Sequence, residues 1–289
     1  MVAQLKIGDV ELETDPAQAL KDFQNAMQRE EASAMEEKGS LRYLREHSSL
    51  IEREALALAQ LGEYSRAVEL HEELIRMDER TVAADPMDLR ALADLEQTLN
   101  DEAAIDEAAA DPALALAGSD RRRYLAAAEK LLIRVVAIMD RAMKIAPTNE
   151  AWKAVQADAQ VRLATIQAIL HGAGTSQELA KAGINSMKIL VSKDQASPTA
   201  LEQAANDILK VEPASLRNSQ FALSCAERAT ALTHRKVPSM LLTLAQAYRA
   251  DGQLEKSRAT ANEGLALLPA LKPGSIKPRI RTLLEIQTR

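Results

Sequence analysis

Few residues in this chain have the types and spacing that chemistry requires. His71-Glu72-Glu73-Leu74-Ile75 begins like a zinc-protease helix, but isoleucine stands where the second histidine ligand is needed. The other histidines, His47, His171 and His234, have no acid or cysteine at ligand or triad spacing. The segment Gly172–Ser176 lacks the lysine and preceding strand of a phosphate-binding loop. We therefore expect a non-enzymatic protein without metal or cofactor, in which His71 packs in the core.

Three charged clusters remain, and we expect none of them to be a catalytic or nucleic-acid site. The arginines 121–123 should be exposed to solvent or paired with the acidic 101–111 helix. The carboxylates between 101 and 111 predict a solvated helix face. Arg121, Arg122 and Arg123 point about 100° apart on a helix, so they cannot form one flat basic patch. The basic residues after Lys272 have no aromatic side chains beside them for stacking on bases. With a net charge of −6, the chain is not expected to bind nucleic acid.

The composition is that of a helical protein. Among 289 residues there are 53 alanines but only one Trp, four Tyr and two Phe, which leaves too few aromatic residues for a typical β-fold. Cys225 is the sole cysteine, so no internal disulfide can form. The most apolar stretch, 125–143, is interrupted by five charged residues, so we expect no membrane insertion and a cytoplasmic location.

Prolines and apolar spacing divide the chain into segments. Apolar residues recur every three or four positions between the prolines, which is typical of amphipathic helices. Because short turns join them, neighbouring helices should pack as antiparallel pairs. The predicted helices are 3–13, 16–37, 41–61, 64–84, 87–110, 119–145, 149–171, 176–194, 198–210, 215–233, 238–250, 254–268 and 276–287.

The clearest internal repeat runs from Pro238 to Pro269. Ala245, Tyr248, Gly252 and Ser257 fall at spacings that resemble the 34-residue tetratricopeptide repeat, and 48–80 is similar. The resemblance implies an all-α fold, a right-handed superhelix (α-solenoid) of antiparallel helix pairs. We expect one array over 1–289, with approximate pairs 1–40, 41–86, 87–147, 148–196, 197–236 and 237–270 and a capping helix at 276–287. Residues 88–195 lack the Gly-Tyr signature, so there we predict helix pairs without standard repeats.

A narrower resemblance covers residues 200–269. The runs ALEQAANDIL at 200–209, EPASLRN at 212–218 and ALSCAERA at 222–229 are similar to the C-terminal repeats of certain bacterial Ser/Thr protein kinases. The chain has no Gly-rich phosphate loop, no His-Arg-Asp and no Asp-Phe-Gly, so no kinase activity is implied. The resemblance implies either the interaction half of such a kinase or a free-standing relative of it.

The repeat resemblance implies a function in protein recognition. Positions 2, 5, 9, 12 and 13 of each first helix would face a concave groove that binds a peptide or partner protein. Of these positions, Asn206, Lys210, Gln246 and Arg249 are our candidates for recognition, because cations and amides suit an acidic peptide or a C-terminal carboxylate. The other groove candidates are Thr199, Glu202, Ser239, Leu242, Glu52 and Gln60.

The alternative is self-association of a structural module. Residues 1–148 carry 18 basic and 30 acidic groups, whereas 149–289 carry 18 basic and 12 acidic groups. The acidic half of one copy could therefore contact the basic half of another.

Overall fold

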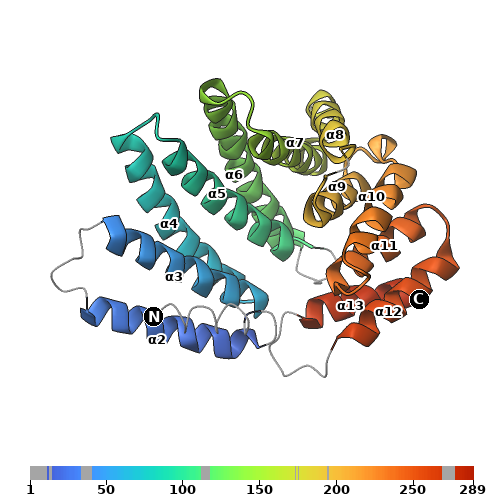
Figure 1. The fold of residues 1–289 in the computed structure, drawn as a ribbon, viewed down its shortest axis with the longest axis horizontal. Helices are drawn as coiled ribbons and strands as arrows, with labels where there is room; N and C mark the ends of the chain where they lie inside the picture. Colours follow the sequence, from blue (N-terminus) through green and yellow to red (C-terminus); the bar gives the residue numbers. More distant parts are fainter. Residues whose placement is uncertain are drawn as a thin grey trace. The chain divides into compact units, whose positions relative to one another are not determined.

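The computed structural model describes residues 12, 15–33, 41–111, 118–172, 174, 176–193, 195–268 and 277–289. These residues form helices joined by turns, and no strand occurs among them, which confirms the all-α prediction (Figure 1). The helices are α2 (Pro16–Ser33), α3 (Leu41–Gln60), α4 (Tyr64–Ala84), α5 (Leu89–Ala109), α6 (Gly118–Ile145), α7 (Glu150–His171), α8 (Gln177–Val191), α9 (Pro198–Lys210), η2 (Ala214–Leu216), α10 (Ser219–Leu232), α11 (Pro238–Ala250), α12 (Leu254–Leu267) and α13 (Lys277–Thr288).

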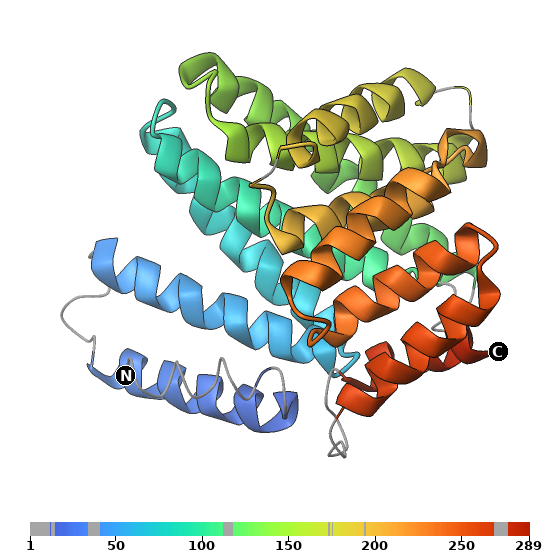
Figure 2. The ribbon, with the colours of Figure 1, turned by 45° about the vertical axis from the view of Figure 1, so that its right-hand side comes forward.

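The chain divides into two compact units. The first comprises Met1–Ala109 and Ala270–Pro278, and the second Ala110–Pro269 and Arg279–Arg289. In the first unit α2, α3, α4 and α5 pack successively against one another. In the second, α6 packs on α7, α7 on α8, α9 on α10 and α11 on α12, and α9 also contacts α7 and α11. Figure 2 shows α11 and α12 side by side. Each unit is therefore a stack of helices that pack against their neighbours in the chain, as in helical-repeat proteins.

Most helix boundaries agree with the predicted ranges to within a few residues. The largest described difference is at 215–233, where the 3₁₀ turn η2 comes first and α10 starts only at Ser219. The side chain of Asn218 caps α10, because its Oδ1 accepts a hydrogen bond from the Phe221 amide at 3.0 Å. Most of the predicted helix 3–13 lies outside the described residues.

The turns after α3 and α11 are built alike. Gly62 and Gly252 have φ of +81° and +79°, in the left-handed region that favours glycine. At the first turn Glu63 N donates to Leu58 O at 2.9 Å, and at the second Gln253 N donates to Tyr248 O at 2.8 Å. These bonds lie at the end of the first helix of each pair, and three residues separate it from the second helix.

Small buried residues hold the helix pairs together in a common register. In α3–α4 they are Ala55 and Ala67, followed by Leu74; in α11–α12 they are Ala245, Ser257 and Gly264. The pair α7–α8 has the same spacing of 12 and then 7 residues, with Ala164, Ser176 and Gly183. In both of the last two pairs, the serine hydroxyl donates to the carbonyl of the alanine 12 residues earlier, at 2.9 Å for Ser176 and 2.8 Å for Ser257.

The register adds a feature that the sequence analysis of α7–α8 did not identify. The pair α7–α8, predicted as a helix pair without a standard repeat, keeps the small-residue contacts of the repeat although it lacks the Gly-Tyr turn.

The C-terminal helix α13 covers an apolar surface of the last pair. Leu284 is fully buried and clusters with Leu242, Ala245, Ala261 and Leu268. A Cβ on Gly264 would lie 2.9 Å from Leu284 Cδ2, so α13 approaches α12 closely at this glycine. Arg258 Nη2 donates to the Arg289 carbonyl oxygen at 3.1 Å, which links α12 to the end of α13.

Candidate functional site

The first helices of successive pairs in the second unit, α7, α9 and α11, lie next to one another. We call the surface that they share the first-helix face, defined by Asp158, Arg162, Glu202, Gln203, Asn206, Lys210, Ser239 and Thr243. Polar side chains on this face meet across the helix boundaries. Four of the predicted groove residues, Glu202, Asn206, Lys210 and Ser239, belong to it.

Between α9 and α11, the contacts centre on Thr243. Its hydroxyl lies 3.3 Å from Asn206 Oδ1 and 3.4 Å from Glu202 Oε1, within hydrogen-bonding distance of both. Burial raises the pKa of Glu202, whereas hydrogen bonds from Ser239 and Thr243 act in the opposite direction. Three of the predicted groove residues, Glu202, Asn206 and Ser239, are therefore brought together around a threonine that the sequence analysis missed.

Between α7 and α9, the bridging residue is Gln203. Its Nε2 donates to Asp158 Oδ1 at 2.7 Å and to Asp207 Oδ1 at 3.0 Å. Arg162 Nη1 donates to Asp158 Oδ2 at 3.0 Å. Arg162, Gln203 and Thr243 recur at intervals of 41 and 40 residues, each near the middle of a first helix. That periodicity is the sequence signal that could have identified them.

The predicted recognition residues differ in how they are placed. Thr199 and Lys210 are exposed on α9, and Gln246 is half-buried on α11. Arg249 is exposed, and its Nη1 donates to the Ile286 carbonyl oxygen of α13 at 3.3 Å. Leu242 is only 8% exposed and packs in the cluster with Leu284, so its side chain serves the core.

Two further candidates, Glu52 and Gln60, lie on α3 in the first unit, where both are half-buried. They cannot be placed on the first-helix face of the second unit.

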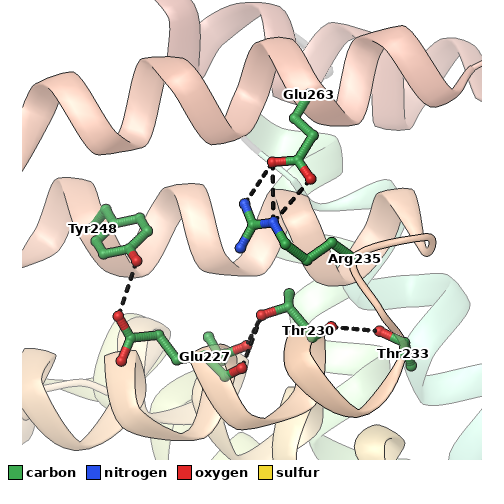
Figure 3. Close-up of polar contacts among 7 residues, drawn as sticks. Glu227, Thr230, Thr233, Arg235, Tyr248 and Glu263 are labelled. Carbon is green, nitrogen blue, oxygen red and sulfur yellow. Dashed lines mark hydrogen bonds and ion pairs between the residues drawn. The ribbon is translucent and has the colours of Figure 1, made fainter.

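A second polar cluster joins α10, α11 and α12. Arg235 binds Glu263 with two nitrogens, Nε at 2.8 Å from Oε1 and Nη2 at 2.6 Å from Oε2, and Tyr248 Oη donates to Glu227 at 2.9 Å (Figure 3). The hydrogen bond from Arg235 lowers the pKa of Glu263. These contacts join successive helices.

His71 and Ser176, which were considered as candidates for metal and phosphate binding, are both buried. His71 is fully buried, as expected of a packing residue, and burial lowers its pKa to about 4. Ser176 of the glycine-rich segment is 2% exposed and donates to Ala164 O, so its hydroxyl does not face a phosphate. Among the described residues, no group of three or more His, Cys, Asp or Glu side chains could hold a metal ion.

The arginines 121–123 act separately. Arg121 Nε donates to Ala110 O at 3.0 Å, Arg122 Nη2 donates to Leu170 O at 3.3 Å, and Arg123 lies 5.0 Å from the Tyr124 ring centre. They form no common phosphate site, as the helical spacing predicts.

The expectation for the acidic segment 101–111 was wrong in part. Glu102 is 5% exposed and Asp106 is 1% exposed, so these two carboxylates do not belong to a solvated face. Charge density alone misled the prediction, because Ala103, Ile105 and Ala109 on the same helix are buried as well.

Comparisons with known proteins assign no family. No protein-family model matches the sequence, and no curated protein matches it as a relative. Among solved structures, yeast Tom70 matches 98% of this chain and 81% of its own, with 12% sequence identity and a TM-score of 0.29. The helices and the register of their contacts define the fold. None of the described helices combines the length and the apolar character needed to cross a membrane.

Proposed function

We propose that this chain is a non-catalytic protein-interaction module, an adaptor or scaffold, whose first-helix face binds a peptide or a partner protein. The observation that carries the proposal is the set of hydrogen bonds across α7, α9 and α11. Gln203 links α9 to Asp158, and Thr243 links α11 to Asn206. Side chains held in this way lose little conformational entropy when a ligand binds, which favours recognition.

The cations on the first-helix face and beside it, toward the C-terminal ends of α9 and α11, favour a ligand with carboxylates. Lys210 and Arg249 are exposed cations near the C-terminal ends of α9 and α11, at the adjacent repeat positions 13 and 12, and Gln246 adds an amide. Arg249 has further N–H donors besides the one that contacts Ile286 O. An acidic peptide or a C-terminal carboxylate is therefore the ligand that we propose. The resemblance of 200–269 to kinase repeats supports bacterial kinase signalling as the context.

Affinity capture from the native lysate, followed by mass spectrometry, tests the proposal. We compare the wild-type chain with a Lys210→Glu/Arg249→Glu variant and with a Lys181→Glu/Lys236→Glu control, which makes the same charge change on other exposed lysines. A partner retained by the wild type and the control but lost by the first variant supports the first-helix face. A partner that all three capture equally would place recognition elsewhere.

Once a partner is identified, single substitutions measure the contribution of each cation. Lys210→Ala and Arg249→Ala should each weaken binding by about 1–3 kcal/mol, measured by calorimetry. If both variants bind with unchanged affinity, these cations do not contact the ligand.

Self-association is the alternative, and the uneven charge of the sequence favours it. Residues 1–148 are net acidic and residues 149–289 net basic. A mass that rises with concentration and returns to that of a monomer in 1 M salt, measured by light scattering, would support this alternative, because salt screens exposed charge contacts.

A further inference from the structure

Two carboxyl groups meet at the junction of α7 and α9. Gln203 Nε2 donates to Asp158 Oδ1 at 2.7 Å and to Asp207 Oδ1 at 3.0 Å, so one amide joins both side chains. Asp207 is 6% exposed, and the Asp158 side chain is 15% exposed. No donor among the described residues reaches Asp207 Oδ2, which is buried. A buried carboxylate oxygen without a donor is costly, so a proton on that oxygen would resolve the arrangement.

The surrounding charges do not balance two carboxylates. On α7, Arg162 Nη1 lies 3.0 Å from Asp158 Oδ2, and its side chain is 10% exposed. On α9, Lys210 acts on Asp207 but is exposed to solvent. One buried cation therefore faces two carboxyl groups.

The charged groups of the other helices that contact α9 are engaged elsewhere. Lys188 of α8 lies over the Phe221 ring, Arg228 of α10 donates to Val191 O, and Arg249 of α11 donates to Ile286 O. Glu178 and Lys181 of α8 pair with each other on the surface. Glu227 of α10 accepts a hydrogen bond from Tyr248. Among the described residues, the cations that act on Asp207 are therefore Arg162 and Lys210.

We propose that Asp158 and Asp207 share one proton, which makes the α7–α9 junction a pH-sensitive latch. The proton sits on Asp207 and is donated to the Asp158 carboxylate, which also accepts from Gln203 and Arg162. Loss of the proton leaves two adjacent negative charges in a buried site, and the junction loosens. This latch belongs to the fold and does not depend on the partner proposed above.

The electrostatics of Asp207 agree with this arrangement. Burial raises the pKa of Asp207 well above its usual range, and the charge and hydrogen bond of Asp158 raise it further, against Arg162 and Lys210. Because the folded-state pKa is raised, the acid pair binds more protons in the native chain than in the unfolded chain between pH 3.8 and its folded pKa. The stability that the pair contributes is therefore fully present below pH 3.8 and is lost as the pH rises through the folded pKa of the pair.

Denaturant unfolding of the full chain across pH 4 to 9 tests the latch. In Asp207→Asn, the amide can donate permanently to Asp158 and its oxygen can still accept from Gln203. We expect the unfolding constant of the wild type, relative to this variant, to increase by up to about tenfold per pH unit above pH 4 and then level off. A ratio that does not change with pH would overturn the proposal.

Asp140→Asn is the matched control. Asp140 on α6 also accepts a hydrogen bond across helices from a glutamine, Gln156 of α7, at 2.5 Å, but it is exposed. This variant should keep the pH profile of the wild type. If it shows the same flattening as Asp207→Asn, the effect is not specific to the acid pair.

A carboxyl NMR titration of the wild type keeps the proposal testable if Asp207→Asn does not fold. The latch predicts that one aspartate titrates well above the other aspartates, and that Asp158→Asn shifts this late titration to lower pH. A spectrum in which Asp207 titrates together with the exposed aspartates would refute the shared proton.

Discussion

The pairs α7–α8 and α11–α12 solve the same packing problem with different sequences. Both place an alanine, a serine and a glycine at the helix contact, and in both the serine donates to the alanine carbonyl. Only α11–α12 has the glycine turn preceded by tyrosine, at Tyr248 and Gly252. The comparison shows that the buried small residues define the pair, whereas the turn is one of several ways to connect it.

A third pair, α3–α4, extends the comparison and supplies the largest expected effect. His71 occupies the buried position at which the other pairs have Ala180 and Ala261. Burial lowers the pKa of His71 from 6.5 to about 4, so the neutral ring is favoured in the fold. This stability is complete above pH 6.5 and is lost as the pH falls to about 4, which corresponds to about 3 kcal/mol.

Urea unfolding at pH 7.5 and pH 4 measures this effect. The free energy of unfolding of the wild type should fall by about 3 kcal/mol more than that of His71→Leu. The exposed His171→Gln variant should keep the wild-type difference. Identical pH profiles for wild type and His71→Leu would show that the histidine is not buried as described.

The glycines of the two compared pairs should respond differently to alanine. A Cβ on Gly183 would lie 2.7 Å from Val161 Cγ2 and 2.8 Å from the Ala157 backbone oxygen, which cannot move easily. A Cβ on Gly264 would meet the flexible end of Leu284 at 2.9 Å. After a gain of about 1 kcal/mol in helix propensity, Gly183→Ala should destabilise by about 1–2 kcal/mol and Gly264→Ala by nearly nothing.

Thermal unfolding of both glycine variants makes this comparison directly. Equal losses of stability in the two variants would contradict the difference in packing between α7–α8 and α11–α12.

Substituting the serine of either pair with alanine should lower the free energy of unfolding by the same amount, because both pairs share this contact. Ser176→Ala and Ser257→Ala each remove a buried hydrogen bond to a backbone carbonyl, at a cost of about 1 kcal/mol in the free energy of unfolding. Ser192→Ala is the control, because its hydroxyl is exposed although it also donates to a carbonyl. A loss confined to Ser257→Ala would mean that α7–α8 does not use this contact.

The smallest effect concerns the turn. His234 follows α10 with φ of +51°, and Arg235 N donates to Thr230 O, as in the turns that use Gly62 and Gly252. His234→Gly relieves the left-handed strain but increases the freedom of the unfolded chain, so we expect a gain of about 0.5 kcal/mol, measured by urea unfolding. A loss of stability would show that the histidine side chain contributes more than the backbone strain costs.

How far the sequence predicts the molecule depends on whether the residues involved are local. The ranges 198–210 and 238–250 were predicted as the structure has them, because a proline and a turn mark their ends. The repeat in α7–α8 was missed, because its turn differs and alanine, serine and glycine are common residues. Glu102 and Asp106 were placed in solvent, because their type was weighed without the buried positions beside them.

The first-helix face shows the same limit. The repeat positions led to Glu202, Asn206 and Ser239, but not to Thr243, around which they gather. They also did not lead to Gln203 and Asp158, which join α9 to α7. Gln203 and Asp158 are 45 residues apart, and the loops between them set which residues meet. Likewise Arg235 and Glu263 come together only because α10, α11 and α12 stack.

The covering of α11 and α12 by α13 has a consequence for how the protein behaves in solution. Repeat stacks have no inherent end, since each pair presents an apolar surface on which another pair can add. Leu284 closes that surface over Leu242, Ala261 and Leu268. If α13 were detached, the apolar surface of the last pair would be exposed, and a second molecule could pack against it. We therefore expect the loss of α13 to favour open-ended filaments and precipitation.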